Sequence, residues 1–235
     1  FTTIIPAVLG ISMVFGPENS QAATVFHRIT IKTGYLIIRD IPSTKGKPAG
    51  VFYKGDDCIP ALGSKKDVGR TWMKVFNPYL RSTGWVDSKF TSPSKSNCDF
   101  EKFLYGTRGK TNWVFDNMTF PLIISSPNAD EEPPVSYSKE EVFSSTKNLN
   151  DNPYYYLKLL DDNEMKKFWA ERDGCAKYEL IENKKYDVNS YTLYFVNKTA
   201  DTASIAFSCL EMYPEFKFRK TENGYILTGI EDSGS

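Results

Sequence analysis

A chain of 235 residues is long enough for one large domain or two small ones, each with its own hydrophobic core. Its composition, 40% hydrophobic and 14% aromatic, is typical of a folded protein and excludes wholesale disorder. With 29 basic side chains, 29 acidic ones and a single histidine, it is neither a uniformly basic nucleic-acid binder nor a protein with a His-rich metal site, and we expect no nucleic-acid partner.

The first 17 residues carry no charge, and their apolar stretch is shorter than the roughly 20 residues that a membrane-spanning helix needs. Ser20 and Ala22 place small residues at the −3 and −1 positions of a cleavage site after Ala22. We interpret residues 1–23 as the remnant of a secretory signal peptide, with a retained apolar segment as the alternative. This interpretation predicts a periplasmic or secreted protein without a transmembrane anchor in the mature chain.

The charges that follow are unevenly distributed. Residues 31–98 carry 12 basic and 5 acidic side chains, a net charge of +7, whereas residues 99–235 carry 16 and 23, a net charge of −7. Such a split indicates two units with different surfaces. Electrostatic docking of the two halves and a basic face that meets an anionic polymer explain it equally well.

Four cysteines allow three disulfide pairings. We expect Cys58–Cys98 and Cys175–Cys209, because each bridge then stays within one charge half. Bridges of this kind belong to oxidising compartments and stabilise a fold by about 2–4 kcal/mol each. The alternative is four free, buried cysteines in a cytosolic protein. Since no CxxC spacing occurs, we expect no structural zinc, and we expect no cofactor.

Residues 31–92 consist of short apolar or alternating runs separated by turn residues, a pattern that predicts five strands in a small β-barrel or sandwich. The runs are Tyr35–Arg39, Gly50–Tyr53, Cys58–Leu62, Thr71–Phe76 and Thr83–Val86. The connections around 63–70 and 77–82 are predicted to be long loops.

Four ordered segments of this region, YLIIRDIPS, AGVFYKGD, TWMKVF and STGWVDSKF, resemble bacterial SH3-like domains. The matching residues are Leu36, Arg39, Pro42, Ser43, Gly50, Lys54, Gly55, Trp72, Lys74, Val75, Gly84, Trp85, Val86 and Ser88. The resemblance implies an all-β SH3-like barrel, with boundaries at residues 24–98, that recognises cell-wall peptide or another short extended ligand. It assigns ligand binding to aromatic side chains and to cations in the long loops. These are Tyr35, Tyr53, Trp72, Tyr79 and Trp85, with Lys65, Lys66, Arg70 and Arg81.

Residues 93–112 are predicted to be a linker and the entry to a second domain, whose boundaries we place at 99–235. One or two strands are predicted within 113–125, and helices are predicted at 138–149 and at about 161–172. Alternating runs after residue 175 predict long antiparallel strands. The expected fold is an α+β domain with two helices packed on an antiparallel sheet. Its element order resembles nuclear-transport-factor-like and cystatin-like folds.

Motifs for catalysis are incomplete. GTRGKT at 106–111 lacks the first glycine of a phosphate-binding loop, because residue 104 is Leu104. The Ser-x-x-Lys motifs at Ser92 and Ser136 lack the partner motifs of penicillin-binding enzymes. His27 lies outside residues 99–235, so that region contains no Cys–His or Ser–His machinery. We therefore predict that the chain is not an enzyme.

The sequence predicts an exported, non-catalytic binding protein for cell-wall peptide or another short extended ligand. The alternative is a periplasmic inhibitor or immunity-type protein that blocks a secreted hydrolase through its acidic domain or the Pro-rich loop 127–136. A third possibility is an enzyme that uses carboxylates of the second domain. Wall binding predicts co-sedimentation with sacculi, whereas inhibition predicts a stable one-to-one protein complex.

Overall fold

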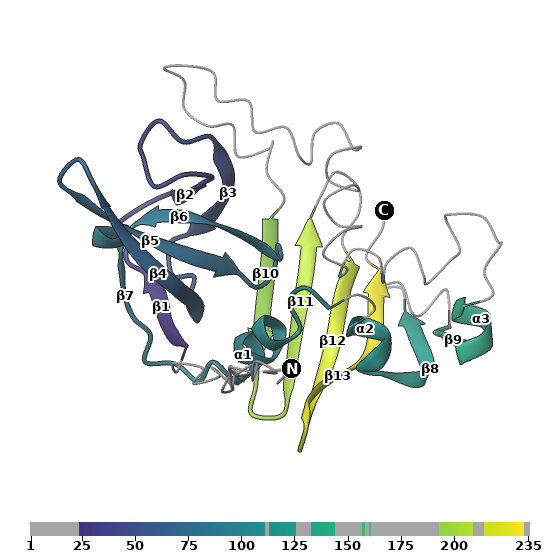
Figure 1. Cartoon of the computed structure of the whole chain (residues 1–235). Coiled ribbons are helices and arrows are strands. Elements are labelled where there is room, and N and C mark those ends of the chain that lie inside the picture. Colours follow the sequence, from purple (N-terminus) through teal and green to yellow (C-terminus); the bar gives the residue numbers. More distant parts are fainter. Residues whose placement is uncertain are drawn as a thin grey trace, which may run out of the picture.

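The computed structural model describes residues 24–110, 113–125, 133–143, 157, 160, 193–208 and 214–232. These residues form two β-sheets, three short α-helices and one 3-10 helix. Figure 1 shows how these elements are arranged. The order of strands is β3-β2-β6-β5-β4-β1-β7 in the first sheet and β10-β11-β12-β13-β8-β9 in the second. No helix among the described residues is both long and apolar enough to cross a membrane.

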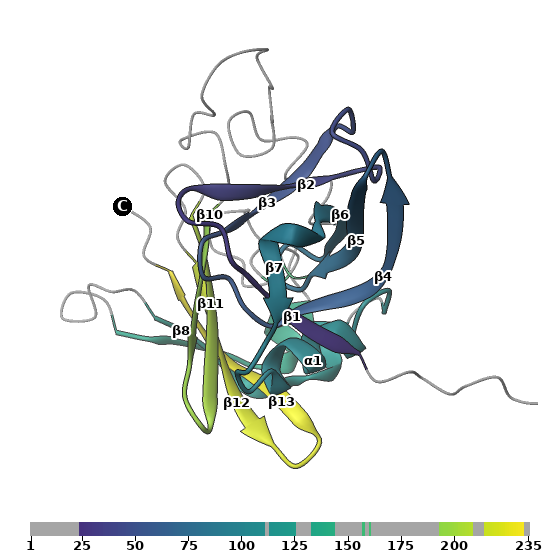
Figure 2. The same ribbon diagram turned by 90° about the vertical axis from the view of Figure 1, so that its left-hand side faces the viewer.

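The first sheet is strongly curved (Figure 2) and all its neighbouring strands are antiparallel. Its strands are β1 (Val25–Ile29), β2 (Tyr35–Arg39), β3 (Pro48–Tyr53), β4 (Ile59–Asp67), β5 (Arg70–Asn77), β6 (Ser82–Asp87) and β7 (Thr91–Pro93), with the 3-10 helix η1 (Ser88–Phe90) between the last two. The five predicted strands are therefore present. Alternation places Leu36 and Ile38 of β2 in a core with Phe52 and Ile59, and burial of each such side chain contributes about 1.5–3 kcal/mol.

The connection predicted around residues 63–70 is a hairpin rather than a loop. Strand β4 continues to Asp67 and β5 begins at Arg70, with their pairing closed by Asp67↔Arg70. Val68 and Gly69 form the two-residue turn, with φ values of 41° for Val68 and 73° for Gly69. Left-handed backbone at both positions is the geometry that suits the twist of a two-residue hairpin.

The second sheet comprises β8 (Met118–Ser125), β9 (Val135–Tyr137), β10 (Leu193–Lys198), β11 (Thr202–Ser208), β12 (Pro214–Thr221) and β13 (Gly224–Asp232). The described helices are α1 (Asp99–Gly106), α2 (Trp113–Asp116) and α3 (Lys139–Phe143). Strands β13 and β8 pair in parallel, and the other pairs are antiparallel. Phe100 of α1 packs against Phe218 and Tyr225, with ring centroids 5.2 and 4.9 Å apart.

The predicted fold class is wrong. The described residues are mostly strands in sheets of seven and six, not an SH3-like barrel followed by two helices on a sheet. The first sheet gains β1 and β7, and β3 and β7 are its two ends, so among the described residues it is an open half-barrel. The strand pattern specified local extension but not these pairings, which join segments far apart in the chain.

The helices also differ from the prediction. The predicted linker 93–112 contains α1, whose Phe100 and Leu104 are buried in the second core. Helix α3 begins with the predicted capping box: Ser138 Oγ accepts from the Glu141 amide at 3.2 Å, and Glu141 Oε2 accepts from the Ser138 amide at 2.8 Å. The helix is described only to Phe143, and the prediction at 161–172 lies outside the described residues.

A disulfide joins the first sheet to the segment that leads into α1. The predicted Cys58–Cys98 bridge is confirmed and ties the start of β4 to the residue before α1. The predicted Cys175–Cys209 bridge and residues 1–23 lie outside the described residues. The division of the chain at residue 98 stays a prediction.

Candidate functional site

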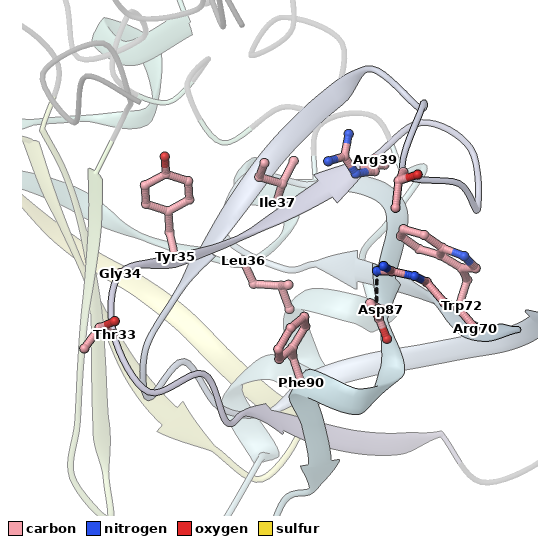
Figure 3. Close-up of a pocket in the computed structure, with 11 residues that line it drawn as sticks. Thr33, Gly34, Tyr35, Leu36, Ile37, Arg39, Arg70, Trp72, Asp87 and Phe90 are labelled. Carbon is pink, nitrogen blue, oxygen red and sulfur yellow. Dashed lines mark hydrogen bonds and ion pairs between the residues drawn. The ribbon is translucent and has the colours of Figure 1, made fainter. Parts of the chain in front are cut away.

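An open pocket lies in the first sheet, beside the first half of β2 (Figure 3). Its volume is about 430 Å³, and it lies between the segment that leads into β2 on one side and β5, β6 and η1 on the other. The residues that line it are Thr33, Gly34, Tyr35, Leu36, Ile37, Arg39, Thr44, Arg70, Trp72, Asp87 and Phe90.

The pocket exists because β6 stops early. Strand β2 pairs with β6 through Arg39↔Trp85, and the same antiparallel register would next place Ile37 opposite Asp87. At Asp87 the chain instead turns into η1, and Asp87 Oδ1 accepts from the Lys89 amide at 3.2 Å. Among the described residues, no strand continues along this side of β2 at Ile37.

The backbone of Ile37 faces the pocket side of β2. On the other side the Gly34 carbonyl accepts from the Lys54 amide at 3.3 Å, so Gly34 and then Leu36 and Ile38 direct their backbone groups toward β3. The alternation of an antiparallel ladder directs those of Ile37 the opposite way, toward the side where β6 has ended. The pocket therefore includes a short stretch of strand edge.

One end of the pocket is cationic. Asp87 is the one acidic residue among those that line the pocket. Its Oδ2 forms ion pairs with Arg70 Nη1 at 3.1 Å and with Lys89 Nζ at 3.6 Å. Arg39 Nη1 donates to the Gly46 carbonyl at 2.6 Å, a bond that holds the guanidinium against the β2–β3 loop. With two arginines lining the pocket and Asp87 already shared by two cations, the local charge is positive.

The other end is aromatic and apolar. Figure 3 shows Tyr35 at the far end from Arg70, with Leu36 and Phe90 between them. A further aromatic side chain, Trp72, lies at the cationic end beside Arg70 and is almost completely buried, at 3% exposure. Its indole nitrogen is buried and has no hydrogen-bond partner among the described residues.

The structure brings together some of the residues that the sequence singled out and separates others. Tyr35, Trp72 and Arg70 line the pocket. Tyr53 lies opposite Tyr35 on β3, and Trp85 of β6 has Lys74 Nζ 6.0 Å from its ring centroid. Lys65 and Lys66 are exposed on the β4–β5 hairpin.

Tyr79 and Arg81 lie elsewhere, in the interior between the two sheets. Arg81 is 4% exposed, lies 4.5 Å from the Trp113 ring and donates to Thr107 Oγ1 at 3.2 Å. Tyr79 packs on Tyr194 with ring centroids 4.7 Å apart. Arg81 thus packs against the ends of α1 and α2, and Tyr79 packs against β10, so we do not include these two residues in the site.

Sequence reasoning missed Arg39, Asp87 and Phe90 as site residues. Arg39 is part of the SH3-like resemblance, but as a fold position rather than a ligand contact. All three lie at the end of a strand or just beyond it. For Arg39 and Asp87, the signal that could have identified them is a charged residue at the end of an apolar strand. Their convergence depends on where β6 ends beside β2.

The polar cluster between the sheets is the second concentration of titratable groups. Tyr79 Oη donates to Glu101 Oε1 at 2.6 Å, and Lys198 Nζ lies 2.5 Å from the same oxygen. Tyr194 Oη donates to Asp56 Oδ2 at 2.5 Å. Burial, with the nearby Glu101 or Asp56 carboxylate, holds the pKa of each tyrosine well above its ordinary value. Burial also raises the pKa of Asp56.

This cluster is better suited to joining the sheets than to chemistry. Cys58, Cys98 and Glu101 bring two sulfurs and a carboxylate oxygen within 4.8 Å of one another, a grouping that could hold a metal ion. Both sulfurs are committed to the disulfide, and Lys198 already neutralises Glu101. The pocket is thus the stronger candidate site among the described residues.

Comparisons with known proteins add little to this geometry. Neither a family model nor a curated protein matches the chain. Among solved structures, the chain is similar to a protein of Bacteroides fragilis described as NTF2-like, with 13% identity and a TM-score of 0.33. The likeness covers 70% of this chain and 60% of that protein. At this TM-score the two folds agree too little to establish a shared architecture, and the SH3-like resemblance finds no match.

Proposed function

We propose that the chain is an exported, non-catalytic binding protein whose pocket takes a short extended ligand such as a cell-wall peptide. The observation that carries the proposal is the stretch of β2 edge at Ile37, left beside the pocket where β6 ends at Asp87. An extended peptide can add to such an edge through main-chain hydrogen bonds while neighbouring pockets select its side chains.

The remaining features of the pocket fit this role. Its volume of about 430 Å³ lies within the roughly 300–1,000 Å³ that is usual for ligand sites. Tyr35 and Phe90 supply aromatic surface next to the strand edge, and the buried Trp72 lines the pocket beside Arg70. The Cys58–Cys98 bridge supports a location in an oxidising compartment, where peptidoglycan is found.

Co-sedimentation of the 235-residue chain with purified peptidoglycan sacculi, at low and high salt, tests the proposal. The informative variant is Ile37→Pro, because proline removes an amide that faces the pocket without removing a hydrogen bond to β3. Ile37→Ala is the matched control, since it keeps the amide and shortens the same side chain. We expect wild type and Ile37→Ala to pellet and Ile37→Pro to stay in solution.

Soluble wild-type protein at every salt concentration would refute wall binding. Equal pelleting of a folded Ile37→Pro variant would refute the role of the strand edge. Thermal melting of all three proteins separates a loss of binding from a loss of fold.

A further inference from the structure

We infer that the ligand of this pocket carries a carboxylate group and that Arg39 and Arg70 bind it. The inference rests on the proposed function and names the chemistry that the site selects. Its basis is the charge of the lining, which contains two guanidinium groups, Arg39 and Arg70, and one carboxylate, Asp87. Asp87 is already paired with Arg70 at 3.1 Å and with Lys89 at 3.6 Å. An anionic group on the ligand would restore neutrality at this end of the pocket.

Both arginines are held in place before any ligand arrives. Arg39 is fixed by its 2.6 Å bond to the Gly46 carbonyl, and Arg70 by its 3.1 Å bond to Asp87. A guanidinium has five N–H donors, and these contacts use one nitrogen of each. The remaining donors form the planar fork that pairs with a carboxylate through two parallel hydrogen bonds.

The pocket also has a direction. Strand β2 runs from Tyr35 to Arg39, and Figure 3 shows the Arg70–Asp87 ion pair and, apart from it, Arg39 on the side of the pocket away from Tyr35. Leu36 and Phe90 form the apolar middle. A ligand that pairs with the edge at Ile37 would therefore place its carboxylate near the arginines and an apolar side chain toward Tyr35. Peptides with a free carboxyl terminus and peptides with an acidic side chain share this chemistry.

The test uses sacculi stripped of phosphate-containing polymers, either untreated or amidated with carbodiimide and ammonia to neutralise their carboxylates. We expect the wild-type chain to pellet with untreated sacculi and to lose at least about ten-fold in affinity for amidated ones, as for the loss of charged hydrogen bonds. Stem peptides released from sacculi, compared with the same peptides amidated only at the carboxyl terminus, then distinguish a terminal carboxylate from a side-chain one.

Matched variants separate recognition from general attraction between charges. Arg39→Lys keeps the charge and loses the planar fork, Arg70→Gln removes a pocket charge without touching the Gly46 bond, and Lys66→Gln removes one charge on the exposed hairpin. We expect about ten-fold weaker binding for each arginine variant and a change of less than two-fold for Lys66→Gln.

The outcomes distinguish a failure of the carboxylate inference from a failure of the proposed binding function. Equal pelleting with untreated and amidated sacculi, still lost in Ile37→Pro, overturns the carboxylate inference and leaves the binding function intact. Equal losses in Lys66→Gln and Arg70→Gln with full binding by Arg39→Lys also overturn it, because attraction between charges then suffices. Failure to pellet with either preparation refutes the proposed function itself.

Discussion

Removal of the Cys58–Cys98 disulfide should destabilise the protein by about 4 kcal/mol at 25 °C. The bridge spans 40 residues of sequence, and the loop-closure entropy that it removes from the unfolded chain grows with the logarithm of that span. The double variant Cys58→Ala/Cys98→Ala loses this constraint. The measurement is urea unfolding followed by tryptophan fluorescence, with the free energy of unfolding extrapolated to water.

The single variant Cys58→Ala is the control, because it breaks the same bridge and leaves one thiol. Cys58 is replaced and the bridge is broken in both variants, so the difference between them reports the side chain at position 98 rather than chain entropy. We expect both variants to lose about the same free energy. A loss below about 1 kcal/mol in both would refute the reasoning, since a bridge of this span would then constrain the unfolded chain very little.

Three further predictions concern the contacts that support the pocket and the sheet junction. Gly84→Ala should lower the free energy of unfolding by about 1–3 kcal/mol and weaken wall binding, because a Cβ there would lie 2.3 Å from Ile38 Cγ2 and 2.8 Å from the Arg39 carbonyl oxygen. Gly106→Ala is the control and should be neutral in thermal melts, because a Cβ there would meet no atom within 4 Å. Arg81→Ala should destabilise by about 2–3 kcal/mol in urea unfolding, since it leaves the buried Leu104 carbonyl and Thr107 with fewer partners, and Lys66→Ala should change stability by less than about 0.5 kcal/mol. Asp56 binds its proton more tightly in the folded protein than in the unfolded chain, so its contribution to stability is greatest at low pH and declines as pH rises from the unfolded pKa through the raised folded pKa. Urea unfolding at several pH values should therefore show wild type losing stability relative to Asp56→Asn as the pH rises through this window, and an unchanged difference would contradict the raised pKa.

The sequence predicted local structure in the first sheet well where short apolar or alternating runs stood between turn residues. In β2, the short apolar run Tyr35–Arg39 identified the strand with its bounds, and the structure then shows Leu36 and Ile38 buried in alternation with partly exposed neighbours. The hairpin was missed because Gly63, Ser64 and Lys66 have the composition of a turn, although the turn itself is Val68–Gly69. Long, exposed hairpin strands have no buried face and so carry no periodic apolar signal.

The fold class could not be derived in the same way. The parallel pairing of β13 with β8 joins residues about a hundred positions apart, and no local pattern records it. Helix α1 did leave a signal, because Phe100 and Leu104 are spaced as i and i+4, but the Ser- and Gly-rich residues around it favoured a linker.

The site was predictable to a similar extent. Within the region of the SH3-like resemblance, residue type singled out Tyr35, Trp72 and Arg70, since aromatic and cationic side chains are common in binding sites. It also singled out Arg81, which is buried against Trp113, because composition does not distinguish a ligand contact from a core contact. The roles that we assign to Arg39 and Ile37 depend on the early end of β6, a tertiary feature.

Amide hydrogen exchange at Ile37 is the most direct test of the central claim, that a ligand pairs with the open edge of β2. Exchange should be measured on the free chain and after addition of soluble peptides released from sacculi. Leu36 is the internal reference, because its backbone groups face β3 in both states. We expect exchange at Ile37 to slow strongly on binding while exchange at Leu36 is unchanged. Binding that leaves the Ile37 amide as fast as in the free protein would contradict it.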